Sequence, residues 1–181
     1  MHLALKLHPD SFSLAATHIN VEVARSHAGS LVFCYFVTGE IGSLRLPPIA
    51  ASVHAEELWQ STCFEAFVRC PASDNYYEFN FAPSTQWAAY QFDGYRSGMR
   101  EAPGVSAPTI AVKASSALFR LQASLALDQL AALPHDATWR LGLSALIEDS
   151  NGRMSYWALT HPPGKPDFHH PDCFAHEFSP T

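Results

Sequence analysis

Residues 59–90 read WQSTCFEAFVRCPASDNYYEFNFAPSTQWAAY, and this stretch sets the expected architecture of the chain. Apolar and polar side chains alternate along two runs on either side of a turn-forming PASDN segment. Because such alternation is the signature of strands, we predict a β-hairpin. If Val68 lies opposite Phe79, the apolar side chains of both runs share one face and build core. On the other face, Arg69 then lies opposite Glu78 among polar groups.

The same alternation recurs on both sides of this hairpin. Strands are also expected over residues 2–7, 18–25, 30–39, 44–46, 87–92, 109–113, 117–127, 139–147, 154–160 and 174–178. Trp139 is in phase with Leu141 and Leu143, so we place its ring in the core. About ten strands joined by short turns are typical of an antiparallel β-sandwich or jelly roll. We predict this all-β class for a single domain that spans residues 1–181.

Short helical pieces and one tight turn interrupt the strands. Asp128 is a suitable N-cap for one short helix over residues 129–133. A further helical turn is expected near residues 56–59, where it would lead the chain into the hairpin. Asn151 and Gly152 fit a type I′ turn between two late strands.

The composition limits the expected partners. The chain carries a formal net charge of -6 and no cluster of Lys or Arg, whereas nucleic acids and anionic membranes bind basic patches. We therefore expect neither as a partner. No apolar run is long enough to cross a bilayer, and the first residues lack the features of a secretory signal. A soluble, cytoplasmic protein is expected.

The spacing of cysteines and histidines argues against a structural metal site. The cysteines are Cys34, Cys63, Cys70 and Cys173. They contain no CxxC pair, which favours reduced thiols over disulfides or a zinc knuckle. The tail between His161 and His176 gathers several histidines and acidic residues, but their spacing matches no closed zinc motif. No metal site is predicted there.

Side chains suited to binding a sugar occur in the hairpin and in the later loops. Sugar rings stack on flat aromatic side chains, while their hydroxyl groups pair with carboxylates, amides and guanidinium groups. The candidate stacking platforms are Trp59, Trp87 and Trp157. The candidate polar partners are Glu65, Arg69, Glu78, Asn80, Arg96, Lys165 and Asp167.

Each of these residues also has a purely structural interpretation. A tryptophan in a strand can bury its large ring in the core. Glu65 can belong to a solvated or ion-paired face together with Arg69 and Glu78. Lys165 and Asp167 can form a surface ion pair of little energetic value.

Four segments resemble the DOMON-like superfamily, in particular its family 9 type of carbohydrate-binding module. They are LWQSTCFEAFV, YYEFNFAPSTQWAAY, FRLQASLAL and SYWALTHPPGKPDFHHPDCF. Trp59 and Glu65 match the tryptophan and glutamate of the family's first hairpin, and Trp157 resembles its late tryptophan. The chain departs from the family at Thr62, where an aspartate is common, and late in strand 117–127, where an acidic residue is common. The resemblance implies a sugar-binding β-sandwich and calcium as its cofactor.

Three functional classes are compatible with these residues. The first, which we expect, is a non-catalytic module that binds a sugar or another small polar ligand in an aromatic-lined cleft. The second is a haem- or metal-binding domain, with Met99, Met154, Lys113 and the histidines as candidate axial ligands. The third is a sugar-acting hydrolase or isomerase with Glu65 and either Glu78 or Asp167 as acid and base, although no GxSxG motif occurs. The oligomeric state stays open.

Overall fold

The computed structural model describes residues 1–25, 30–126, 130, 133–134 and 136–179. Its strands are β1 His2–Leu7, β2 Ala16–Arg25, β3 Ser30–Gly39, β4 Cys63–Arg69, β5 Tyr76–Phe81, β6 Trp87–Phe92, β7 Arg100–Glu101, β8 Thr109–Ala114, β9 Leu118–Ala126, β10 Trp139–Glu148, β11 Met154–Ala158 and β12 His176–Phe178. The 3₁₀ helices are η1 Ile41–Ser43, η2 Leu58–Gln60 and η3 Pro171–Cys173. All pairs between these strands are antiparallel, which confirms the predicted all-β class.

Two of the predicted helical pieces have different outcomes. Asp128 and most of the helix expected over residues 129–133 lie outside the described residues. The turn expected near residues 56–59 is found as η2.

None of the helices in the described part of the chain has the length and apolar character of a membrane span. No disulfide joins the four cysteines, as their spacing predicts.

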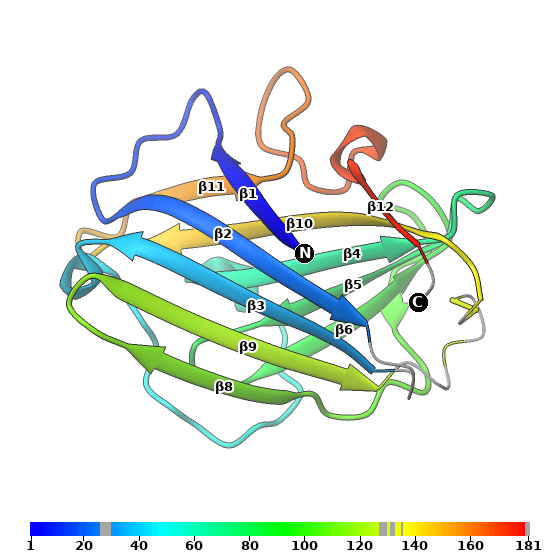
Figure 1. Cartoon of the computed structure of the whole chain (residues 1–181), viewed down its shortest axis with the longest axis horizontal. Helices are drawn as coiled ribbons and strands as arrows, with labels where there is room; N and C mark the ends of the chain where they lie inside the picture. Colours follow the sequence, from blue (N-terminus) through cyan, green and yellow to red (C-terminus); the bar gives the residue numbers. More distant parts are fainter. Residues whose placement is uncertain (26–29, 127–129, 131–132, 135, 180–181) are drawn as a thin grey trace.

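The strands form one continuous sheet that curls over on itself. Their order is β7-β6-β5-β4-β10-β11-β1-β2-β3-β9-β8, and β12 is added alongside β10. Strand β1 joins the two halves, because Lys6 and Leu7 pair with β11 whereas residues 2–5 pair with β2. Figure 1 shows the front layer, β2, β3, β9 and β8, lying across the back layer, β10, β4, β5 and β6.

The core fills the space between the two layers. The rings of Tyr35 on β3 and Phe64 on β4 lie 5.1 Å apart, and the Phe64 ring stacks on Phe119 of β9 at 5.7 Å. The hydroxyl of Tyr35 donates a hydrogen bond to the backbone carbonyl of Glu65 at 2.7 Å. Trp139 is 1% exposed, which confirms its predicted place in the core. These contacts fix the front layer against the back layer.

The first hairpin has the predicted faces but not the predicted partners. Val68 pairs with Tyr77 rather than with Phe79, and Glu78 pairs with Phe67. The pairing is therefore displaced by two residues, a shift that leaves every side chain on its predicted face. Arg69 consequently does not lie opposite Glu78.

The second hairpin has a longer turn than the sequence predicts. A type I′ turn needs positive φ at both of its central residues. Gly152 has a φ of 77°, but Asn151 is not among the residues with positive φ, so the prediction of a type I′ turn is wrong. The backbone N–H of Asp149 donates to the carbonyl of Arg153, which leaves a three-residue loop with its glycine in the left-handed region. The Asp149 carboxylate accepts the N–H groups of Asn151 and Arg153, each at 2.9 Å, and holds the loop in this form.

Candidate functional site

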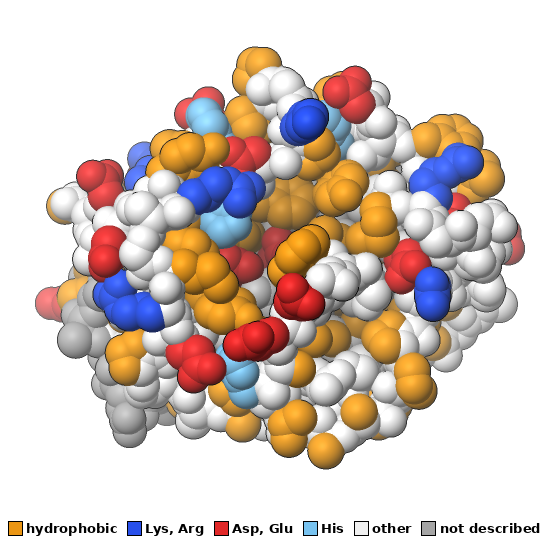
Figure 2. All heavy atoms as spheres, turned by 180° about the vertical axis from the view of Figure 1, so that it is seen from behind, with side chains coloured by type: hydrophobic (Ala, Val, Ile, Leu, Met, Phe, Trp, Pro, Cys, Tyr) orange, Lys and Arg blue, Asp and Glu red, His pale blue; other side chains and the backbone are white. Residues whose placement is uncertain are grey.

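A pocket of about 910 Å³ opens on the outer face of the back layer, on the opposite side of the sheet from the core. Figure 2 shows this hollow, where acidic and hydrophobic side chains gather. Its lining comes from strands and from three loops: Glu56, Glu57, Trp59, Gln60, Glu65, Glu78, Tyr90, Phe92, Arg96, Met99, Leu146, Met154, Tyr156, Pro166, Phe168 and His169. A pocket of this size is large enough for a small organic ligand.

Two glutamates on neighbouring strands form the floor of the pocket. Glu65 on β4 is 4% exposed, and Glu78 on β5 is 6% exposed. The hydroxyl of Ser144 donates to Glu65 Oε2 at 3.0 Å, and the amide of Asn80 donates to Glu78 Oε1 at 2.7 Å. Strand alternation places both carboxylates on the face away from the core.

Burial changes the ionisation of these two glutamates. It raises the pKa of Glu78 to about 7, against the opposing effects of Asn80 and Arg96. It also raises the pKa of Glu65 well above its usual value, and the nearby charge of Glu78 adds to this rise. The floor of the pocket therefore holds protons near neutral pH that exposed glutamates would release.

An ion pair between two loops closes one side of the pocket. Arg96 donates from Nη2 and Nε to Asp167 Oδ1, at 2.7 Å and 3.2 Å, and the hydroxyl of Tyr95 donates to Asp167 Oδ2. Burial raises the pKa of Asp167, but the hydrogen bonds from Tyr95 and Arg96 outweigh burial and hold this pKa below its usual value. The loop is strained here, because Arg96 has a φ of 51°.

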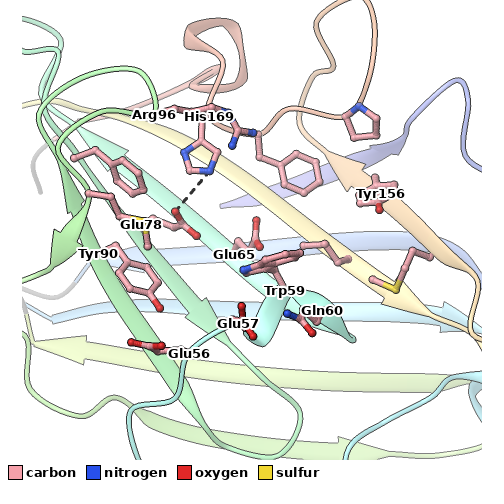
Figure 3. Close-up of a pocket in the computed structure, with 16 residues that line it drawn as sticks. Glu56, Glu57, Trp59, Gln60, Glu65, Glu78, Tyr90, Arg96, Tyr156 and His169 are labelled. Carbon is pink, nitrogen blue, oxygen red and sulfur yellow. Dashed lines mark ion pairs between the residues drawn. The ribbon is translucent and has the colours of Figure 1, made fainter.

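His169 lies above the carboxylate of Glu78 (Figure 3). Burial and the charge of Arg96 lower the pKa of His169 to about 4, so its imidazole is neutral at pH 7. One ring nitrogen, Nδ1, lies 2.8 Å from the hydroxyl of Tyr76. The other, Nε2, lies 3.8 Å from Glu78 Oε2, which is beyond hydrogen-bonding distance.

Trp59 forms the exposed aromatic wall of the pocket. It belongs to η2, which follows Glu57 in the left-handed conformation with a φ of 57°. Trp59 is 53% exposed, and it lines the same pocket as Glu65 (Figure 3). The structure thus brings together the flat ring and the carboxylate that a sugar would need.

The predicted ligand-binding residues divide into two groups. Trp59, Glu65, Glu78 and Arg96 line the pocket directly. Asn80 and Asp167 support them by hydrogen bonds to Glu78 and Arg96.

The other four predicted residues lie away from the pocket lining. Trp157 is 4% exposed within the core, as the structural alternative allows. Trp87 packs its ring edge-on against His54 at 5.4 Å. The guanidinium of Arg69 lies over Phe174 at 4.7 Å. Lys165 is exposed, and the ion pair expected between Lys165 and Asp167 is replaced by the one from Arg96.

Several lining residues escaped the sequence analysis. Tyr90 lies directly opposite Glu78 on β6, and Tyr156 lies opposite Leu146 on β11. Their phase along each strand was readable, but their nearness to the glutamates depends on pairing between strands that are distant in the sequence. His169 comes from the tail between His161 and His176, and the sequence predicts neither a metal site there nor a place for His169 in the pocket. Among the described residues, no group of three or more His, Cys, Asp or Glu is placed to hold a metal ion, so they offer no such cluster to the calcium that the resemblance implies.

The fold is an antiparallel β-sandwich with a pocket on the outer face of one layer. No protein-family model and no curated protein matches the sequence. Solved structures do share the fold. A proposed carbohydrate-binding protein from Bacteroides uniformis is 14% identical with a TM-score of 0.65, and the match covers 100% of this chain and 86% of that chain.

A family 9 carbohydrate-binding module from Caldicellulosiruptor kristjanssonii is also similar. Its complex with glucose gives a TM-score of 0.53 at 12% identity, covering 91% of this chain and 76% of that chain. Its complex with cellotriose gives a TM-score of 0.54 at 12% identity, covering 91% and 74%. The predicted resemblance to family 9 modules is therefore confirmed for the fold.

Proposed function

We propose that the protein is a non-catalytic module that binds a small glycan in the pocket beside Trp59. The observation that carries this proposal is that the half-exposed Trp59 and the buried carboxylate of Glu65 line one pocket. The C–H face of a sugar ring stacks on an indole, and its hydroxyl groups hydrogen-bond to carboxylates. The complexes of the similar family 9 module with glucose and cellotriose support the same class of ligand.

The polar groups of the pocket suit a ligand with several hydroxyl groups. Glu65 and Glu78 accept hydrogen bonds when ionised and donate one when protonated. The pKa of about 7 makes both states of Glu78 accessible near neutral pH, and burial raises the pKa of Glu65 as well. Arg96 supplies donors at the rim, where Asp167 fixes its orientation. Such prearranged groups bind without the loss of freedom that a mobile side chain suffers.

A second hollow extends the site beyond one sugar unit. Its volume is about 290 Å³, and it shares Met154, Tyr156 and Pro166 with the main pocket. At its far end the exposed ring of Phe12 lies under the guanidinium of Arg153 at 5.5 Å. The shared residues place the two hollows next to each other, which supports a short oligosaccharide as ligand.

Calorimetry with glucose, cellobiose and cellotriose tests the proposal. We expect saturable binding, and Trp59→Ala should weaken it at least about tenfold because stacking is lost. Phe36→Ala is the matched control, since it removes a half-buried aromatic ring from β3 in the other layer. Absence of binding to any mono- or oligosaccharide in a broader glycan screen would overturn the proposal.

A second candidate function is a sugar-acting hydrolase or isomerase. The two buried carboxylates on neighbouring strands favour it, because a raised pKa suits a general acid. Product formation from a bound sugar, abolished by Glu65→Gln while binding persists, would establish this activity in place of simple binding.

The haem-binding alternative has one supporting observation and one opposing it. Met99, Met154 and His169 line the pocket and are side chains of the types that ligate haem iron. The glutamates of the same pocket would repel the two propionates of haem. We expect purified protein to show no Soret absorbance, and a stoichiometric Soret band would replace the glycan proposal.

A further inference from the structure

Acidic side chains outnumber basic ones in the pocket. The lining glutamates are Glu56, Glu57, Glu65 and Glu78. Arg96 is the single Lys or Arg among the described residues of the lining, and its charge is paired with Asp167. Because His169 is neutral at pH 7, it does not restore the balance. The exposed carboxylates of Glu56 and Glu57, together with the ionised fraction of Glu78, whose pKa is about 7, therefore present a negative field to a ligand.

The floor glutamates each keep an oxygen available to a ligand. Ser144 occupies Oε2 of Glu65, and among the described residues no hydrogen bond reaches Oε1. Asn80 occupies Oε1 of Glu78, while Oε2 has only the 3.8 Å approach of His169. Both side chains are more than nine-tenths buried, so a donor that reaches these oxygens acts in a weakly screened environment.

Aromatic rings line the same pocket as these oxygens. Five of the lining residues are aromatic in addition to His169: Trp59, Tyr90, Phe92, Tyr156 and Phe168. A cation within about 6 Å of such a ring is attracted to its face, most strongly for tryptophan. Carboxylates and aromatic faces together favour an ammonium group over a neutral hydroxyl.

We infer that the ligand is a sugar that carries a protonated amine, with the ammonium group directed to Glu78 and Glu65 and the sugar ring stacked on Trp59. This inference rests on the proposed function, since it names the kind of sugar that the same pocket binds. A sugar that carries a carboxylate would meet like charges and is excluded by the same field. The amine also favours the ionised form of Glu78, so its binding releases a proton near neutral pH.

Calorimetry with four monosaccharides at pH 7 tests the inference. Glucosamine should bind at least about tenfold more tightly than glucose, a difference of about 1.4 kcal/mol. N-acetylglucosamine keeps a substituent at the same carbon but has no charge, so it should bind no better than glucose. Glucuronic acid should bind most weakly of the four.

The variant Glu78→Gln separates the charge from the shape of the site. It should lower the affinity for glucosamine about tenfold more than the affinity for glucose, so that the preference for glucosamine disappears. Glu177→Gln, which removes an exposed carboxylate on β12, is the matched control and should change neither. If Glu78→Gln does not fold, the double variant Glu56→Gln and Glu57→Gln at the exposed wall should lower the affinity for glucosamine about threefold.

The outcomes distinguish the inference from the proposed function. Equal affinities for glucose and glucosamine would overturn the inference and leave the glycan-binding function intact. A preference for glucosamine that survives both the Glu78 variant and the double variant would also overturn it, because the pocket carboxylates would not be its source. Absence of binding to all four sugars and to the broader screen would overturn the proposed function itself, and the inference with it.

Discussion

Replacing Glu78 with glutamine should make the stability of the protein less sensitive to pH. Burial raises the pKa of Glu78 from 4.5 to about 7, so the folded protein holds this proton more tightly than the unfolded chain does. The stability that the proton contributes is complete below pH 4.5 and is lost as the pH rises through about 7. Glutamine keeps the size of the side chain and the acceptor for Asn80, but it cannot ionise.

The shift in pKa sets the size of this effect. A rise from 4.5 to about 7, at about 1.4 kcal/mol per pKa unit, corresponds to about 3 kcal/mol. Glu65 lies on the neighbouring strand and also favours a proton, so the two groups share part of this energy. We expect Glu78→Gln to match the wild type within about 1 kcal/mol at pH 5 and to be more stable by about 2 to 3 kcal/mol at pH 8.

Urea denaturation between pH 5 and pH 8, followed by the fluorescence of the buried Trp139, measures this difference. Glu177→Gln is again the control, because its carboxylate is exposed beside Arg140 and the stability difference should stay within about 0.5 kcal/mol at every pH. If the free energies of unfolding of the wild type and Glu78→Gln differed by the same amount at every pH, the argument that folding favours protonated Glu78 would be refuted.

Three further predictions test the core and the rim of the pocket. Phe64→Ala should lower the free energy of unfolding by about 3 to 5 kcal/mol, measured in urea, because the ring is fully buried between the layers. Asp167→Asn should weaken sugar binding severalfold by releasing Arg96, while thermal melts show a stability change below about 1 kcal/mol because the ion pair is partly exposed; unchanged affinity would contradict the positioning role. The folded protein keeps His169 neutral, so the wild type loses stability as the pH falls from 6.5 to about 4 and the unfolded chain takes up this proton. His169→Gln should lose less stability over the same pH range.

Alternation along strands was enough to predict which residues face the core. Trp139 and Phe64 are buried as their phase requires, and Glu65 and Glu78 share the opposite face. The register of the first hairpin was not predictable in the same way, because sliding one strand by two residues leaves every face unchanged. Local turn chemistry was also insufficient for Asn151, whose loop is held by the side chain of Asp149.

The candidate site was only partly predictable, because contacts between distant segments assemble it. Ser144 and Glu65 are 79 residues apart in the sequence, and Arg96 and Asp167 are 71 residues apart. The sequence shows that these residues have suitable chemistry, but not that they meet. Trp157 shows that suitable chemistry does not by itself place a residue in the site, because this tryptophan lies in the core instead of stacking on a ligand.

Strand β1 connects the half of the sheet that carries the pocket to the other half. It pairs with β11, which supplies Met154 and Tyr156 to the lining, and His8 just after it donates a hydrogen bond to the Tyr156 carbonyl. Removing residues 1–8 would uncover β11 in one layer and β2 in the other, two unpaired edges at once. Such edges template pairing between molecules. A protein shortened in this way should therefore aggregate through its sheets as well as lose its ligand.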